Sequence, residues 1–138
     1  MAQMIRGAYQ LLVKLETDQT ITVGHLGTFV FPAGWYVYTG SAMNGIENRL
    51  ARHLRRQKRF HWHIDYLLER ARLIGYAIKE SCVREECELN RRTLSIPGAA
   101  VPVVGFGSSD CGCKSHLVHF AVKPSLLLPV QFLAECER

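Results

Sequence analysis

The stretch at residues 35–42, Trp-Tyr-Val-Tyr-Thr-Gly-Ser-Ala, decides the interpretation of the fold. Its first five residues are aromatic or β-branched, which is typical of a buried strand, and a glycine and a serine then end the run. A basic amphipathic segment follows, in which Arg49 and His53 are four residues apart and share one helix face. We predict a strand that delivers a Tyr38-x-Gly40 corner to the start of a helix. Such a corner is a candidate phosphate-handling site; the alternative is a buried strand followed by a solvated basic helix.

Composition limits the class of protein. A chain of 138 residues predicts a single domain over residues 1–138, and 48% hydrophobic with 21% charged residues predicts a globular rather than a disordered chain. The formal net charge of +5 and the pI of about 9.1 favour a polyanionic partner. The distribution of charge is more informative, because residues 49–59 contain basic side chains and no acid. They are Arg49, Arg52, Arg55, Arg56, Lys58 and Arg59.

The expected cellular location is the cytoplasm, without a membrane partner. Residues 1–6 lack the apolar core of a signal peptide, and no stretch approaches the roughly 18 apolar residues of a membrane span. Five cysteines are an odd number, so we do not expect a complete disulfide framework.

The remaining pattern predicts an α+β fold, a short antiparallel β-sheet flanked by helices. Strands are expected at 7–16, 20–23, 28–31 and 35–39, joined as an antiparallel meander, with later strands at 73–78 and 117–122. Helices are expected at 44–57, 61–72, 84–94 and 126–133. Asn44 would cap the first of them, and Ile46, Leu50 and Leu54 would form its buried stripe.

Several short motifs, in their order along the chain, resemble the GIY-YIG nuclease superfamily. Gly7-Ala8-Tyr9 and Tyr38-Thr39-Gly40 match its two tyrosine motifs, and Glu86, with Leu89 three residues later, is similar to its metal-binding glutamate. Arg49 and His53 stand where the superfamily has its helix arginine and a following histidine. The phrases at 61–66 and 105–111 resemble the Uri-type endonuclease branch, a domain of unknown function of type 123 that is also found fused to endonuclease III-like repair enzymes. The resemblance covers most of residues 5–122, although residues 10–37 separate the two tyrosine motifs more widely than is usual in the superfamily.

The resemblance implies a GIY-YIG-like fold and a metal-dependent endonuclease acting in DNA repair or processing, with association with a base-excision repair enzyme. Glu86 would hold Mg²⁺ or Mn²⁺, although Glu85 and Glu88 lie within one turn of it. Arg49 would bind phosphate oxygens and Tyr38 would complete the cluster. For activation of water, family precedent favours Tyr9, whereas the ordinary titration of an imidazole near neutral pH favours His53.

The basic run is expected to follow the phosphate backbone of a nucleic acid, with DNA favoured over RNA and with strongly salt-dependent binding. Its members are Arg52, Arg55, Arg56, Lys58 and Arg59. His61 or His63 would face the nucleic acid or cap the helix. A metal site formed by these histidines with Asp65 is not favoured, because alternate residues of a helix point apart.

Two cysteines one residue apart, Cys111 and Cys113, could hold a structural zinc together with His116 and Cys87. The alternative is that these cysteines are ordinary small core residues. Two other functions remain open at this point: a nucleic-acid-binding domain that does not cleave, and a zinc-stabilised adaptor that docks onto a repair enzyme.

Overall fold

A five-stranded antiparallel sheet forms the centre of the protein in a computed structural model that describes residues 5–55, 59–108 and 111–133. The strand order is β6-β4-β1-β5-β7. The strands are β1 (Gly7–Leu15), β4 (Gly34–Ala42), β5 (Arg72–Glu80), β6 (Leu117–Phe120) and β7 (Gln131–Phe132), and the helices are α1 (Ile46–Leu54), α2 (His63–Leu68) and α3 (Glu86–Leu94). The predicted α+β class, a short sheet flanked by helices, is confirmed.

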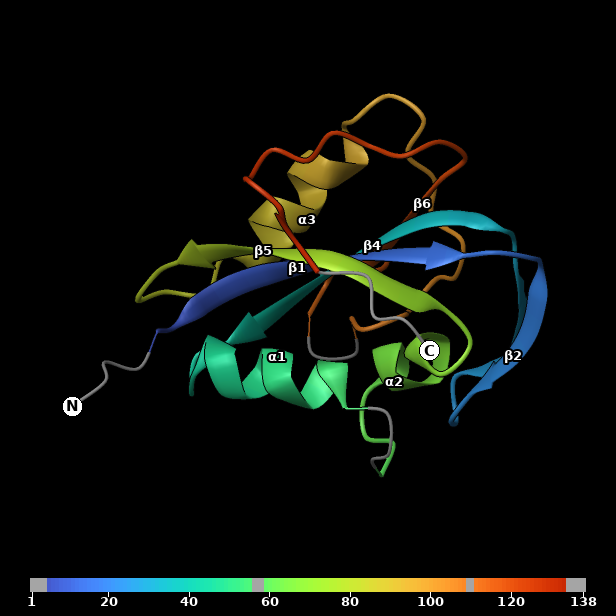
Figure 1. Cartoon of the computed structure of the whole chain (residues 1–138), viewed down its shortest axis with the longest axis horizontal. Helices are drawn as coiled ribbons and strands as arrows, with labels where there is room; N and C mark the ends of the chain where they lie inside the picture. The colour runs from blue at the N-terminus through green and yellow to red at the C-terminus, as the bar shows by residue number, and fades with distance from the viewer. Residues whose placement is uncertain (1–4, 56–58, 109–110, 134–138) are drawn as a thin grey trace.

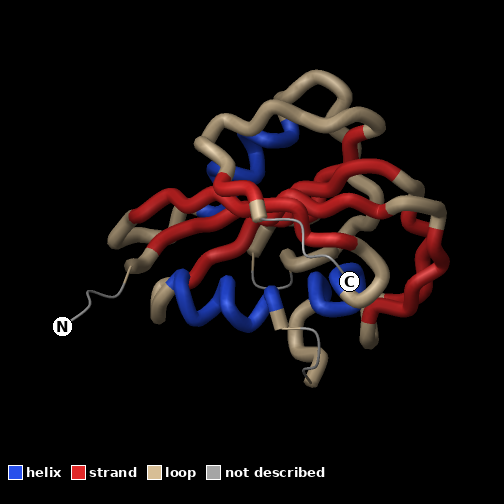
Figure 2. The backbone as a smooth tube through the Cα atoms, viewed as in Figure 1, coloured by secondary structure: helices blue, strands red, loops and turns tan. Residues whose placement is uncertain are grey.

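The helices cover opposite faces of this sheet. Helices α1 and α2 lie on one face and α3 lies on the other (Figure 1), and the tube in Figure 2 shows the same three layers. No helix in the part of the chain that the structure describes is long and apolar enough to cross a membrane.

Alternation along β1 builds a core on each face. Tyr9, Leu11, Val13 and Leu15 join the larger core beneath α1 and α2, whereas Leu12 joins the smaller core of the α3 face. The intervening Gln10 donates to the hydroxyls of Thr39 at 3.0 Å and Thr93 at 2.7 Å, and so connects the sheet with α3. Because β1 lies at the centre of a sheet that is covered on both faces, nearly all of its residues are buried.

The predicted meander is wrong at its second strand. The strands β2 (Gln19–Val23) and β3 (Gly27–Phe31) pair only with each other and form a separate two-stranded sheet, beside α2. The neighbour of β1 is therefore β4, in a register that places Tyr9 opposite Gly40. The β1–β4 ladder joins nine residue pairs, whereas the β2–β3 ladder joins five, and the longer ladder favours the pairing of β1 with β4.

Helix boundaries also differ from expectation. Helix α1 begins after Gly45 rather than after Asn44 and ends before Arg55, and the predicted end at Gln57 lies outside the described residues. His53 is buried in place of Leu54, whose side chain is exposed. The predicted helix at 126–133 is absent: its last residues instead form β7, which pairs with β5. Pro129 lacks the N–H that a helix interior needs, which explains this outcome.

Candidate active site

A pocket of about 290 Å³ collects side chains from five separate segments. Residues 38–41 of β4 form one wall, Arg49 of α1 the next, and residues 61–63 before α2 the third. Arg84 and Glu86, at the start of α3, face this pocket together with three residues of the following loop, Gly107, Cys111 and His116. Of the predicted catalytic residues, Tyr38, Arg49 and Glu86 are thus brought to one cavity.

Arg49 is held in place from two sides. Its Nη1 donates to the carbonyl of Ser41 at 3.0 Å, and its guanidinium lies 4.2 Å from the ring centroid of Trp62. A guanidinium has five N–H donors, so these contacts orient it without using all of them. The arrangement presents a permanent positive charge to the pocket at a defined position.

Glu86 differs from the two acids beside it. Its Oε2 atom is buried and has no hydrogen-bond partner among the described residues. By contrast, Glu85 accepts from Lys79 at 2.8 Å, and Glu88 is paired with Arg91 and Arg92 on the surface. An orphaned carboxylate oxygen carries a high desolvation cost that a cation or a donor would offset. Of the three acids that the sequence left open, Glu86 is the one that lines the pocket.

Tyr9 and His53 lie beneath the pocket and are not among its lining residues. Their side chains are bonded to each other, Tyr9 Oη to His53 Nε2 at 2.8 Å, and both are buried. Burial raises the pKa of Tyr9 to about 12, against the opposing effect of Arg49. A Cβ on Gly40 would come within 2.6 Å of the Tyr9 ring and hydroxyl. Gly40 is therefore needed for this close approach inside β4, which runs on to Ala42 without the predicted corner.

Two further lining residues are expected to donate hydrogen bonds. Burial raises the pKa of the Tyr38 phenol, so the hydroxyl remains protonated. Burial lowers the pKa of His63, so its imidazole is neutral near pH 7. His63 Nδ1 accepts the backbone N–H of Gly107 at 2.8 Å, which places the ring proton on Nε2.

The predicted nucleic-acid contacts divide into two groups. Arg52 donates to both oxygens of the fully buried Asp65 at 2.9 Å, and the backbone N–H groups of His61 and Trp62 donate to the same carboxylate. Arg52 therefore connects α1 with the start of α2. The exposed predicted residues are Arg55, Arg59 and His61, whereas Arg56 and Lys58 lie outside the described residues.

The predictions missed Arg84. It is exposed, lines the pocket, and precedes Glu86 by two residues. The signal was its basic charge beside the predicted metal ligand, in a segment assigned only to the start of a helix. Trp62 and Ser41, which hold Arg49, were also missed because such contacts depend on tertiary structure.

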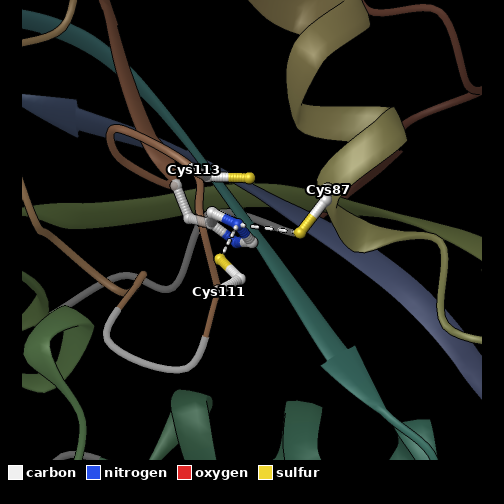
Figure 3. A group of neighbouring side chains, drawn as sticks. Cys87, Cys111 and Cys113 are labelled. Atoms are coloured by element: carbon white, nitrogen blue, oxygen red, sulfur yellow. Dashed lines mark hydrogen bonds between the residues drawn. The ribbon is translucent and has the colours of Figure 1, made fainter.

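A second cluster adjoins the pocket and could bind a metal such as zinc. The ligand atoms of Cys87, Cys111, Cys113 and His116 all lie within 4.8 Å of one another. Cys87 projects from the start of α3 toward the sulfurs of Cys111 and Cys113, which belong to the loop (Figure 3). Burial, together with the neighbouring thiols, raises the pKa of Cys87 to about 12. A bound cation would reverse this effect, because coordination deprotonates a thiol.

Comparison with known proteins gives a single family. The family model described as "Domain of unknown function DUF123" matches residues 8–135. No curated protein and no solved structure matches the chain.

Proposed function

We propose that this chain, which belongs to the family described as Domain of unknown function DUF123, is a Mg²⁺-dependent endonuclease that hydrolyses nucleic-acid phosphodiester bonds. The observation that carries the proposal is that Arg49 and Glu86 line the same pocket. The guanidinium of Arg49 is oriented there, and the buried carboxylate oxygen of Glu86 has no hydrogen-bond partner among the described residues. A phosphodiester needs both: positive charge for its oxygens and a carboxylate to hold a divalent cation.

The residues present fit Mg²⁺ at Glu86. Mg²⁺ takes oxygen ligands, keeps several waters, and is commonly held by one or two carboxylates together with substrate phosphate. Glu86 supplies one buried carboxylate oxygen that lacks any other described partner. When bound, the ion would polarise the scissile phosphate and stabilise the leaving oxygen.

The chain's own residues would surround the phosphate. Arg49 would bind nonbridging oxygens through the N–H groups directed away from Ser41, and Arg84 would add a second positive charge. Tyr38 and the Nε2–H of His63 would donate hydrogen bonds to the same group. His61 is an exposed imidazole on the lining, and it would act as the general base for the attacking water.

Tyr9 and His53 have a positioning role in this proposal. Neither lines the pocket, and the pKa of about 12 disfavours ionisation of Tyr9 near neutral pH. Their hydrogen bond joins β1 to α1 directly beneath Gly40. They would therefore fix the relative position of the strand and the helix that carries Arg49.

DNA is the favoured substrate and repair or processing the favoured role, both on the family resemblance. Exposed Arg55 and Arg59, near the end of α1, would contact phosphates outside the pocket. Association with a base-excision repair enzyme belongs to the same proposal.

The test is strand cleavage of labelled duplex, branched and single-stranded DNA and of matched RNA, at low salt, with Mg²⁺ or with chelator. Glu86→Gln and Arg49→Ala should lose cleavage while retaining binding. Glu88→Gln is the matched control, because Glu88 lies in the same first turn of α3 but forms surface ion pairs and does not line the pocket. Binding without cleavage of any substrate would instead identify a nucleic-acid-binding domain, and neither binding nor cleavage would favour the zinc-stabilised adaptor.

A further inference from the structure

We propose that Cys87, Cys111, Cys113 and His116 bind one structural zinc ion that holds Glu86 in the wall of the pocket. The inference deepens the proposed function and rests on it in so far as Glu86 binds the catalytic cation. It assigns two metals to the protein, a thiolate-bound zinc and an oxygen-bound magnesium, with different tasks.

The four side chains have the number, type and spacing of a closed zinc site. Structural zinc is four-coordinate and tetrahedral, and three thiolates with one imidazole are a common set. With Zn–S near 2.3 Å and Zn–N near 2.0 Å, tetrahedral ligand atoms are separated by about 3.5–3.8 Å. His116 Nε2 lies 3.4 Å from Cys111 Sγ and 3.6 Å from Cys87 Sγ. Little movement is therefore needed to close the site around an ion.

The histidine is already in the tautomer that zinc requires. His116 Nδ1 lies 3.0 Å from the carbonyl oxygen of Thr39, so the ring proton is on Nδ1 and Nε2 presents its lone pair to the three sulfurs. A hydrogen bond to the second ring nitrogen is the usual way in which a metal-bound imidazole is oriented. The same residues are also joined through the backbone, since Thr39 N–H donates to the His116 carbonyl at 3.0 Å.

The ligands come from different walls of the pocket. Cys87 follows Glu86 directly in the first turn of α3, and His116 is bonded to Thr39, which follows Tyr38 in β4. Cys111 belongs to the loop whose Gly107 donates to His63. One ion would therefore fix α3, β4 and the loop relative to one another.

The start of α3 needs such a constraint. Its N-cap residue, Glu85, makes no side-chain capping bond, and the ion pair of Glu85 with Lys79 is partly exposed, which limits its strength. The later part of the helix is well anchored: Asn90 donates to the carbonyl of Ser115 at 2.7 Å, and Thr93 accepts from Gln10. Cys87 would anchor the remaining end, next to the buried oxygen of Glu86 that no described residue holds.

The first measurement is the zinc content of the purified full chain. We expect about one zinc per chain in the wild type and in Cys82→Ser, whose cysteine is exposed outside the cluster, and almost none in Cys113→Ser. Replacing zinc by Co²⁺ should give the visible bands of a tetrahedral thiolate site. Cys113→His keeps four ligands and should retain zinc if the serine variant fails to fold. Wild type without zinc, or Cys113→Ser with full zinc, would overturn the site.

The second measurement tests the effect on Glu86 without relying on cleavage. Mn²⁺ binding, followed by electron paramagnetic resonance, should be weakened about tenfold or more when zinc is removed from the wild type by a chelator. Glu86→Gln should bind Mn²⁺ equally weakly with zinc present, and Glu88→Gln should bind it normally. Mn²⁺ affinity that does not depend on zinc would refute the coupling.

The two proposals can fail separately. Zinc-dependent Mn²⁺ binding without cleavage of any substrate would support the coupling and reject the nuclease. Cleavage that needs Mg²⁺ but is unchanged by zinc removal would support the nuclease and reject the coupling. Zinc-loaded protein that binds no Mn²⁺ would reject the coupling and the magnesium site together.

Discussion

Gly40→Ala provides a direct test of the packing beneath the pocket. A Cβ at this position would come within 2.6 Å of both the ring and the hydroxyl of Tyr9, and the Tyr9 ring is only 1% exposed and cannot move into solvent. Overpacking of a core costs about 1–3 kcal/mol. Loss of the hydrogen bond from Tyr9 to His53 adds about 1 kcal/mol. We therefore expect the free energy of unfolding to fall by about 2–4 kcal/mol.

The assay is equilibrium unfolding in urea, followed by circular dichroism and by tryptophan fluorescence. Gly112→Ala is the matched control, because a Cβ at Gly112 would meet no atom within 4 Å. It should change the free energy of unfolding by less than about 0.5 kcal/mol. In a Tyr9→Leu background, which removes the phenol, the cost of Gly40→Ala should fall by about half or more. Equal effects of Gly40→Ala and Gly112→Ala would refute the proposed contact.

Three other predictions concern the charged and polar groups. Tyr9→Phe should cost about 1 kcal/mol of stability through the lost bond to His53 but should retain metal-dependent cleavage, measured on labelled DNA; loss of cleavage with an intact fold would make Tyr9 the water activator. Arg84→Ala should reduce the slope of log binding constant against log salt concentration by about one, whereas Arg91→Ala, which removes a surface partner of Glu88, should leave it unchanged in the same titration. Asp65→Asn should cost about 3 kcal/mol at neutral pH, because it breaks an ion pair with a fully buried carboxylate. Burial alone would raise the pKa of Asp65, but its hydrogen bonds lower it. The stabilisation from this carboxylate is therefore complete above about pH 4 and is lost as the pH falls through the pKa of Asp65 in the folded state. The difference in free energy of unfolding between the wild type and Asp65→Asn should shrink in acid, and a constant difference would contradict the assignment.

The sequence predicted local structure better than strand pairing. The strands β1 and β4 followed from aromatic and β-branched runs, but their direct pairing did not, because nothing in the local pattern says that the β2–β3 hairpin leaves the main sheet. The predicted buried face of α1 was nearly correct, because Ile46 and Leu50 are buried as expected and His53 takes the place of Leu54. His53 stands seven residues after Ile46 and Leu54 eight, so both fit the apolar face, and only the packing against Tyr9 decides between them.

The site was predictable in its main residue types and not in its supporting contacts. Tyr38, Arg49 and Glu86 were identified from short motifs, and the structure places all three around one pocket. The choice of Glu86 over its neighbours required tertiary structure, since all three acids share the first turn of one helix. Arg52 illustrates the opposite case, in which a residue typical of a solvated basic face is bound to a carboxylate that the sequence does not mark as buried.

Buried contacts beneath the pocket fix the positions of side chains that line it. Asp65 is fully buried, a costly place for a carboxylate, and its partners are Arg52 and the backbone of His61 and Trp62. These contacts fix the chain at Trp62, whose ring lies 4.3 Å from the guanidinium of Arg52 and 4.2 Å from that of Arg49. Asp65 therefore affects the pocket by fixing the position of Arg49, and not by a contact with the substrate. Replacing a buried ion pair by apolar side chains is often neutral or stabilising, so the role of the Arg52–Asp65 pair in this interpretation is to orient the residues at the pocket.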